Sequence, residues 1–229
     1  MKAKYRRETF KSRAEWLKAR GFGGSSASAI IGSNPWMSKL ELYNAIVNPK
    51  SAKEKKQSES MQYGVRCEPL IREEFRLDHP EWKVRDPKDF AMYRRTDKPY
   101  LTATLDGEIR EMDGKKVARK GILEIKTHDM RGKKDAEQWE EGRIPQNYFI
   151  QVLHYLMVMT DFDFAVLVGK LRHFDMVGGK WTLTRTETVY RWIFRDEVKD
   201  QIEFLERAET EFYEENIRKR IPPIQSIGF

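Results

Sequence analysis

The chain has 229 residues, of which 39% are hydrophobic and 34% are charged, so it is long enough for one domain with a substantial core. Its 43 lysines and arginines against 36 acidic residues give a formal net charge of +7, which favours polyanionic partners. Cys67 is the only cysteine, which excludes an intrachain disulfide and a metal cluster on four cysteines of this chain. We expect a cytoplasmic protein, because a lone cysteine fits a reducing compartment and neither a secretory signal nor an apolar run of roughly 20 residues is present.

Residues 1–80 are expected to form helices and one polar loop. The segment SSASAII predicts a short helix with Ser25 or Ser26 at its N-cap. The segment PWMSKLELYNAIV has a proline in the first-turn position and apolar residues at helical spacing, which predicts a second helix. A lysine-rich stretch at 48–60 predicts a solvated loop, and MQYGVRCEPLIREEF predicts a third helix.

From Trp82 onward the apolar period changes to two. This period predicts successive strands in the segments FAMYRR, YLTATLD, EIRE and VARKGILEIKT. Turns are expected at Asp106-Gly107 and at Asp113-Gly114. These segments are expected to build the central sheet of residues 82–186.

The rest of the chain returns to helices around one more pair of strands. PQNYFIQVLHYLMVMT predicts a helix of about four turns at 145–160. FAVLVGK predicts a buried strand, and LRHFDMVGGKWTLTRTE predicts a hairpin that turns at Gly178-Gly179. A charged, amphipathic stretch at 187–220 predicts a long C-terminal helix. The order of elements predicts one α/β or α+β domain with a central mixed sheet flanked by helices.

The strand GILEIKT carries an acid and a base within an apolar segment. Side chains alternate across a sheet, so two sets form, with Leu123, Ile125 and Thr127 on one face and Ile122, Glu124 and Lys126 on the other. The same alternation in YLTATLDGE places Thr102, Thr104 and Asp106 opposite the apolar set Leu101, Ala103 and Leu105. If the two strands pair, Asp106, Glu124 and Lys126 meet at one edge of the sheet.

Two neighbouring carboxylates need a positive charge between them, and oxygen ligands suit Mg²⁺ or Mn²⁺. The backbone carbonyl of Ile125 is a further candidate ligand. A metal at this point would polarise a phosphate, and Lys126 would orient the attacking water. Taken alone, the pair Glu124 and Lys126 is more typical of an ordinary charged pair on the polar face of a half-exposed strand.

The rest of the chain favours the catalytic interpretation through a resemblance. The order of several motifs resembles that of the lambda-exonuclease family, also called YqaJ-type viral recombinases. In chain order these motifs are GFGGSSASAIIG, YGVRCEPLIREEF, Asp106, LEIK and PQNYFIQVLHYLMV. This family belongs to the PD-(D/E)xK nucleases, so the resemblance implies a restriction-endonuclease-like core in a single exonuclease domain over 1–229. It also implies a Mg²⁺-dependent 5′→3′ exonuclease acting on double-stranded DNA ends, a homotrimeric ring, and a single-strand annealing protein as recombination partner.

The resemblance also implies roles for individual residues. Asp106, Glu124 and Lys126 match the catalytic triad, although Leu105 stands where the family has proline. Glu68 matches a helix glutamate that supports the metal directly or through water, and Gln151 matches a glutamine at the active site.

A site for the terminal 5′-phosphate is implied as well. The family's arginine and serine near the N-terminus map to Arg20 and to Ser26 or Ser25, and Thr104 matches a hydroxyl residue two positions before the catalytic aspartate. Guanidinium groups and helix N-termini both bind phosphate, which is consistent with these roles.

The sequence is also compatible with two other functions. One is a different PD-(D/E)xK endonuclease or repair nuclease, although the lone Cys67 disfavours the kinds that carry an iron–sulfur cluster. The other is a non-catalytic DNA-binding or assembly protein, which the intact Asp106, Glu124 and Lys126 disfavour.

Overall fold

The computed structural model describes residues 3–48 and 58–224, so most of the polar loop expected at 48–60 lies outside the described residues. The strands are β1 (Tyr5–Thr9), β2 (Trp82–Arg85), β3 (Ala91–Arg95), β4 (Thr102–Ala103), β5 (Gly107–Asp113), β6 (Lys116–Met130), β7 (Phe164–Val177) and β8 (Lys180–Phe194). The α-helices are α1 (Arg13–Ala19), α2 (Gly24–Ile30), α3 (Lys39–Val47), α4 (Glu59–Asp78), α5 (Lys133–Glu137), α6 (Gln146–Val158) and α7 (Lys199–Glu211). Two short 3-10 turns, Glu140–Gly142 and Arg195–Val198, and a π-helical turn, Phe212–Arg218, complete the described elements.

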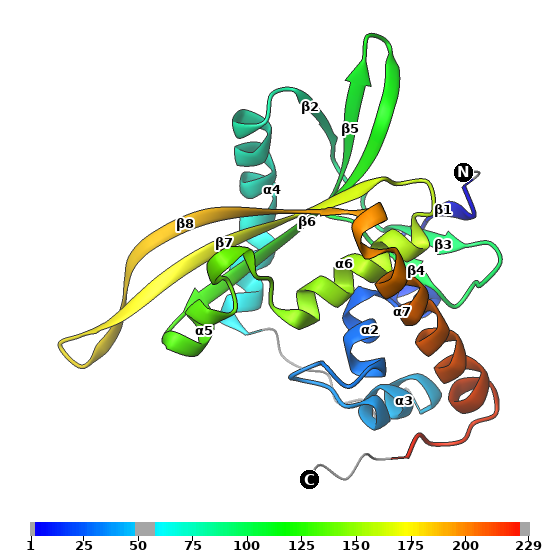
Figure 1. The fold of residues 1–229 in the computed structure, drawn as a ribbon. Helices are drawn as coiled ribbons and strands as arrows, with labels where there is room; N and C mark the ends of the chain where they lie inside the picture. Colours follow the sequence, from blue (N-terminus) through cyan, green and yellow to red (C-terminus); the bar gives the residue numbers. More distant parts are fainter. Residues whose placement is uncertain (1–2, 49–57, 225–229) are drawn as a thin grey trace.

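The strands form two sheets, as Figure 1 shows. The larger has the order β2-β5-β6-β7-β8, and the smaller has the order β1-β3-β4. Only β6 and β7 pair in parallel within the larger sheet, and the connection between them contains α5 and α6. This architecture confirms the expected central mixed sheet flanked by helices. A parallel pair needs such a crossover because its strands start at the same end of the sheet.

Two hydrophobic cores cover the two faces of the large sheet. On one face, Phe75 of α4 packs with Leu123 and Ile125 of β6. On the other face, Leu156 of α6 packs with Ile122 of the same strand. The expected alternation in GILEIKT is therefore confirmed, and both faces of β6 are buried at its centre, as is typical of a strand with a parallel neighbour.

Two helix starts differ from the expectation. The N-cap of α2 is Gly23, so Ser25 and Ser26 lie inside the first turn instead of capping it. The next helix, α3, begins after Ser38, because Ser38 and Glu41 form a reciprocal capping box that satisfies the first free backbone amides.

The segment before β5 is also shorter as a strand than its alternation indicates. Of YLTATLD, only Thr102–Ala103 forms β4, and it pairs with β3 in the small sheet. The chain then crosses to the large sheet, so Asp106-Gly107 is the entry into β5 and not a hairpin turn. The turn at Asp113-Gly114 is confirmed, with Gly114 at a φ of 57° between β5 and β6.

The prediction of a C-terminal helix at 187–220 is wrong for its first eight residues, 187–194. The hairpin does turn at Gly178 and Gly179, with φ values of 55° and 78°, but β8 continues to Phe194. Residues 187–194 pair with β7 along their whole length, and this ladder outweighs the helical charge pattern. In Figure 1 the tip of this hairpin extends away from the helices.

A substitution at Gly121 tests how closely β6 and β7 are packed. Gly121 lies opposite Phe164, and a Cβ at this glycine would overlap the fully buried Phe164 ring. We expect Gly121→Ala to lower the free energy of unfolding by about 1–3 kcal/mol, measured by urea denaturation. Gly132→Ala is the control, because a Cβ there meets no atom within 4 Å, and its effect should stay within about 0.5 kcal/mol. Equal effects of the two substitutions would contradict this account of the packing.

Candidate active site

The structure brings Asp106, Glu124 and Lys126 together. Asp106 directly precedes β5, whose first residue, Gly107, lies opposite Leu123 of β6. The Asp106 carboxylate accepts a hydrogen bond of 2.8 Å from the backbone N–H of Ile125. The N–H and C=O of one strand residue point to the same edge, so the Ile125 carbonyl faces the edge at which Asp106 lies.

Glu124 is a buried acid at the centre of this site. It is 1% exposed, and its Oε1 atom accepts hydrogen bonds of 2.5 Å from Lys126 Nζ and from Gln151 Nε2. Its Oε2 atom is buried and has no hydrogen-bond partner among the described residues. The Lys126 side chain is 21% exposed, and its ammonium lies 5.5 Å from the centroid of the Tyr148 ring. This burial excludes an ordinary solvated pair on an exposed strand face.

Helix α6 supplies the support for Glu124. Gln151 also donates to the Tyr155 hydroxyl at 2.9 Å, so both hydrogens of its side-chain amide are engaged. Gly24 allows α2 to approach this point, because a Cβ on Gly24 would overlap Gln151 and lie 2.9 Å from Cε1 of Tyr155. The close packing of α2 on α6 therefore holds Gln151 against Glu124.

A buried histidine one turn further along α6 anchors this helix. His154 and Glu209 of α7 are both 0% exposed, and they are linked by a hydrogen bond of 2.8 Å. The other ring nitrogen, Nε2, donates to the backbone carbonyl of Thr102 at 2.9 Å, because a carbonyl can only accept. His154 thus ties the helix of Gln151 to the segment that leads to Asp106.

Arg72 of α4, which no sequence motif above singles out, supports the site from the opposite face of the sheet. This arginine is 6% exposed and donates to the backbone carbonyl of Asp106 at 2.7 Å. It also donates to Glu68 at 2.5 Å and to Asp86 at 3.2 Å. The available signal was its spacing, since Arg72 follows the predicted site residue Glu68 by four positions and so shares its helix face.

The charges of the site are unbalanced. Burial, and then the Asp106 carboxylate, raise the pKa of Glu124 to about 8 and that of Glu68 to about 6. Burial also raises the pKa of Asp106, although Lys126 opposes this shift. Burial favours neutral Lys126, but the Glu124 and Asp106 carboxylates outweigh it and raise the lysine pKa. For all three acids burial is the largest cause of the raised pKa, and the nearby cations offset it only in part.

A divalent cation fits this donor set. Such an ion would give the unpartnered Glu124 Oε2 atom a ligand bond and would relieve the repulsion between Glu124 and Asp106. Within residues 3–48 and 58–224, no three His, Cys, Asp or Glu side chains lie close enough to hold a metal alone. The remaining ligands would be the Ile125 carbonyl and water, and Mg²⁺ commonly keeps several waters.

The residues expected to bind a 5′-phosphate lie beside α2 and before β5. The Arg20 guanidinium stacks 5.1 Å above the Trp16 ring, and its Nη2 would lie 2.9 Å from a Cβ on Gly23. In the described part of the chain this guanidinium has no hydrogen bond or ion pair. Ser25 is exposed, and Ser26 and Thr104 are half-buried.

Comparison with known proteins places this architecture in a family. A model of the YqaJ-like viral recombinase domain matches residues 15–163. The "uncharacterized protein YqaJ" of Bacillus subtilis (strain 168) is 32% identical over 212 residues, which are 90% of this chain and 57% of that protein. The chain therefore spans little more than half the length of this relative.

Two solved structures share the fold at low sequence identity. An alkaline exonuclease (LHK-Exo) from Laribacter hongkongensis has a TM-score of 0.53 at 16% identity, with 90% of this chain and 96% of that chain covered. A phage-related exonuclease from Haemophilus somnus 129PT has a TM-score of 0.54 at 16% identity, with 90% and 98% covered. The expected family and fold class are therefore confirmed. No helix in the described part of the chain is long and apolar enough to span a membrane.

The donor set leads to a prediction about metal binding. We expect millimolar Mg²⁺ or Mn²⁺ to raise the thermal unfolding midpoint, because a ligand that binds only the folded state stabilises it by about 2.7 kcal/mol at 100 times its Kd. Glu124→Gln should remove this rise, since it removes a carboxylate ligand. Glu211→Gln, at an exposed position on α7, should keep it. An equal rise for Glu124→Gln and the unmodified protein would exclude Glu124 from the metal site.

Proposed function

We propose, because the chain belongs to the YqaJ-like viral recombinase family, that it is a Mg²⁺-dependent 5′→3′ exonuclease acting on one strand of linear double-stranded DNA. The products would be mononucleotides and a 3′ single-stranded tail for phage-type recombination. The observation that carries this proposal is the convergence of Asp106, Glu124 and Lys126 on one partly accessible point. Mn²⁺ is expected to substitute for Mg²⁺, since both take oxygen ligands.

The residues of the site have separable roles in this reaction. A bound divalent cation would polarise the scissile phosphate and lower the pKa of an attacking water. Lys126 remains cationic beside Glu124 and is placed to hold that water or to neutralise charge that develops on the phosphate. Gln151 and Arg72 are positioning residues, because one holds the Glu124 carboxylate and the other holds the Asp106 backbone.

The 5′→3′ direction of the proposal depends on recognition of a terminal phosphate. Arg20 supports this role, because its guanidinium lies over the start of α2, and α2 packs on Gln151 and Tyr155 of the site. Ser26 or Ser25 and Thr104 are proposed as the hydroxyl partners of the same phosphate. A homotrimeric ring and a single-strand annealing partner belong to the same proposal and rest on the family alone.

A digestion series tests the proposed function. Purified protein with Mg²⁺ is incubated with linear duplex DNA and with closed circular DNA of the same sequence. We expect release of mononucleotides from the linear substrate only. Cleavage of the circle would favour an endonuclease on the same core. No cleavage of either substrate in Mg²⁺ or Mn²⁺ would favour a DNA-binding protein without catalytic activity.

Lys126→Ala tests the chemistry of the site. We expect this substitution to abolish detectable hydrolysis, because it removes the cation beside Glu124, while the affinity for duplex DNA stays within a factor of about 3. Rates of nucleotide release and binding by fluorescence anisotropy measure the two effects. Lys199→Ala, at an exposed lysine on α7, is the control and should cut at the normal rate. Turnover by Lys126→Ala at the normal rate would show that another residue supplies the cation.

Arg20→Ala tests recognition of the DNA end. We expect the rate advantage of a 5′-phosphate over a 5′-hydroxyl substrate to disappear, because the guanidinium would no longer bind the phosphate oxygens. Arg13→Ala, at the start of the helix that Arg20 directly follows, is the matched control, since Arg13 is exposed and has no ion pair among the described residues. An unchanged preference in Arg20→Ala would remove Arg20 from the phosphate site.

A further inference from the structure

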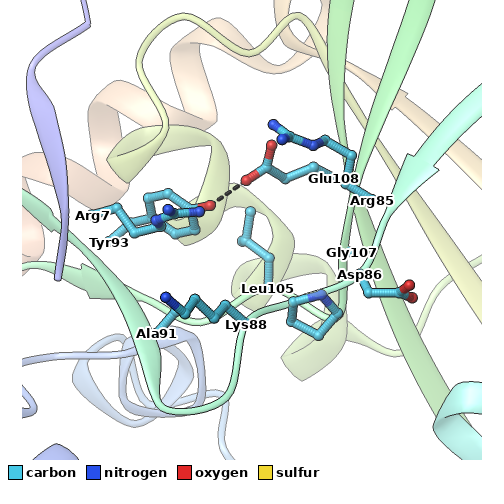
Figure 2. Close-up of a pocket in the computed structure, with 10 residues that line it drawn as sticks. Arg7, Arg85, Asp86, Lys88, Ala91, Tyr93, Leu105, Gly107 and Glu108 are labelled. Carbon is cyan, nitrogen blue, oxygen red and sulfur yellow. Dashed lines mark hydrogen bonds between the residues drawn. The ribbon is translucent and has the colours of Figure 1, made fainter. Parts of the chain in front are cut away.

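A second concave site lies behind the catalytic segment. This cavity of about 80 Å³ is open to solvent and lies where the small sheet meets β2 and β5 (Figure 2). Four strands and one loop contribute its polar side chains: Arg7 of β1, Arg85 of β2, Tyr93 of β3, Glu108 of β5 and Lys88 of the loop between β2 and β3. No single segment of the sequence therefore contains this cavity.

Positive charge is in excess in the cavity. Its wall includes two acids, but the Asp86 carboxylate points away from the centre in Figure 2 and accepts hydrogen bonds from Arg76 at 2.8 Å and Arg72 at 3.2 Å. Glu108 is the acid that points inward, and it accepts a short hydrogen bond from the Tyr93 hydroxyl. Three cationic side chains therefore face one carboxylate.

None of the three cations forms an ion pair with a described residue. Arg85 lies opposite Glu108 in the β2–β5 ladder, yet the side chains of Arg85 and Lys88 form no ion pair or hydrogen bond with any described residue. Arg7 lies opposite Tyr93 in the β1–β3 ladder and donates to its hydroxyl, which carries no charge. A guanidinium fork beside an ammonium, with a surplus of positive charge, is a binding site for a phosphate group.

The cavity is physically connected to the candidate active site. Leu105 and Gly107 line it, and the residue between them is Asp106. A second link runs through Asp86, whose carboxylate contacts Arg72, which in turn holds the Asp106 carbonyl. A group bound in the cavity would therefore lie one chain segment away from the catalytic carboxylates.

We infer that this cavity binds a backbone phosphate of the DNA whose strand is cut at Asp106 and Glu124. The inference rests on the proposed function, because it takes its ligand from the DNA of the neighbouring site. The cationic side chains and the small volume of the cavity fit the phosphodiester and not the nucleobase as the bound group. The contact is consequently independent of sequence.

The test measures DNA binding without divalent metal, so that no cleavage occurs. The double variant Arg85→Gln, Lys88→Ala is compared with the unmodified protein and with Lys199→Ala, another exposed lysine that has no ion pair with a described residue. Affinity for a short duplex is measured by fluorescence anisotropy over a range of KCl concentrations. Thermal unfolding is used to check that the substituted side chains, which are all exposed, do not alter folding.

Loss of one phosphate contact should reduce the slope of log K against log salt by about 1 in the double variant, equally for duplexes of different sequence. Lys199→Ala should keep the slope of the unmodified protein. An unchanged slope in the double variant overturns the inference. If the slope is unchanged but binding of deoxyadenosine monophosphate or inorganic phosphate is lost, the cavity binds a free phosphate and the assignment to the DNA backbone is also overturned.

These outcomes are separate from those of the nuclease assay. A reduced slope together with no digestion of linear DNA would contradict the proposed function alone. Digestion together with an unchanged slope would contradict the phosphate cavity alone.

Discussion

The site depends on the point at which β5 stops pairing with β6. The β5–β6 ladder ends at the pair Gly107 and Leu123, but β6 continues to Met130 with β7 on its other side. The next free backbone N–H on that edge, at Ile125, is satisfied by the carboxylate of Asp106 instead of by another strand. A backbone donor left unpaired inside a protein is costly, so this hydrogen bond fixes the aspartate against Glu124. Had the strand pairing continued, no open edge would remain for a substrate or a metal.

Burying acids at this edge is unfavourable, and the surrounding polar side chains offset part of the cost. Lys126 and Gln151 both hold the same oxygen of Glu124, and Arg72 reaches Asp106 and Glu68 from the far side of the sheet. The raised pKa values of the acids show that this compensation is incomplete. On the proposed function, a bound cation would offset the remaining cost of burying these acids beside the open edge.

The helices that hold these side chains are themselves linked over long stretches of sequence. His154 joins α6 to Glu209 of α7 and to the carbonyl of Thr102, and Gly24 lets α2 pack directly on Gln151. The N-terminal and C-terminal helices thus share in fixing one glutamine. The two cores on either side of the sheet give this arrangement its rigidity, since β6 packs against both.

The local features of this protein can be predicted from its amino-acid pattern. Alternation in GILEIKT correctly separates Glu124 and Lys126 from Leu123 and Ile125, because side-chain direction in a strand depends only on the backbone. The helix that carries Gln151 is also evident from its period and from Pro145 at its start. Other features depend on contacts between segments that are distant in the chain. Residues 187–194 form a strand because they pair with β7 along their whole length. Asp106 lies where the chain passes from the small sheet to the large one, and the alternation of side chains does not predict this passage. Arg72 and the cationic cavity arise where separate elements meet, and contacts between distant segments leave no periodic signal in the chain.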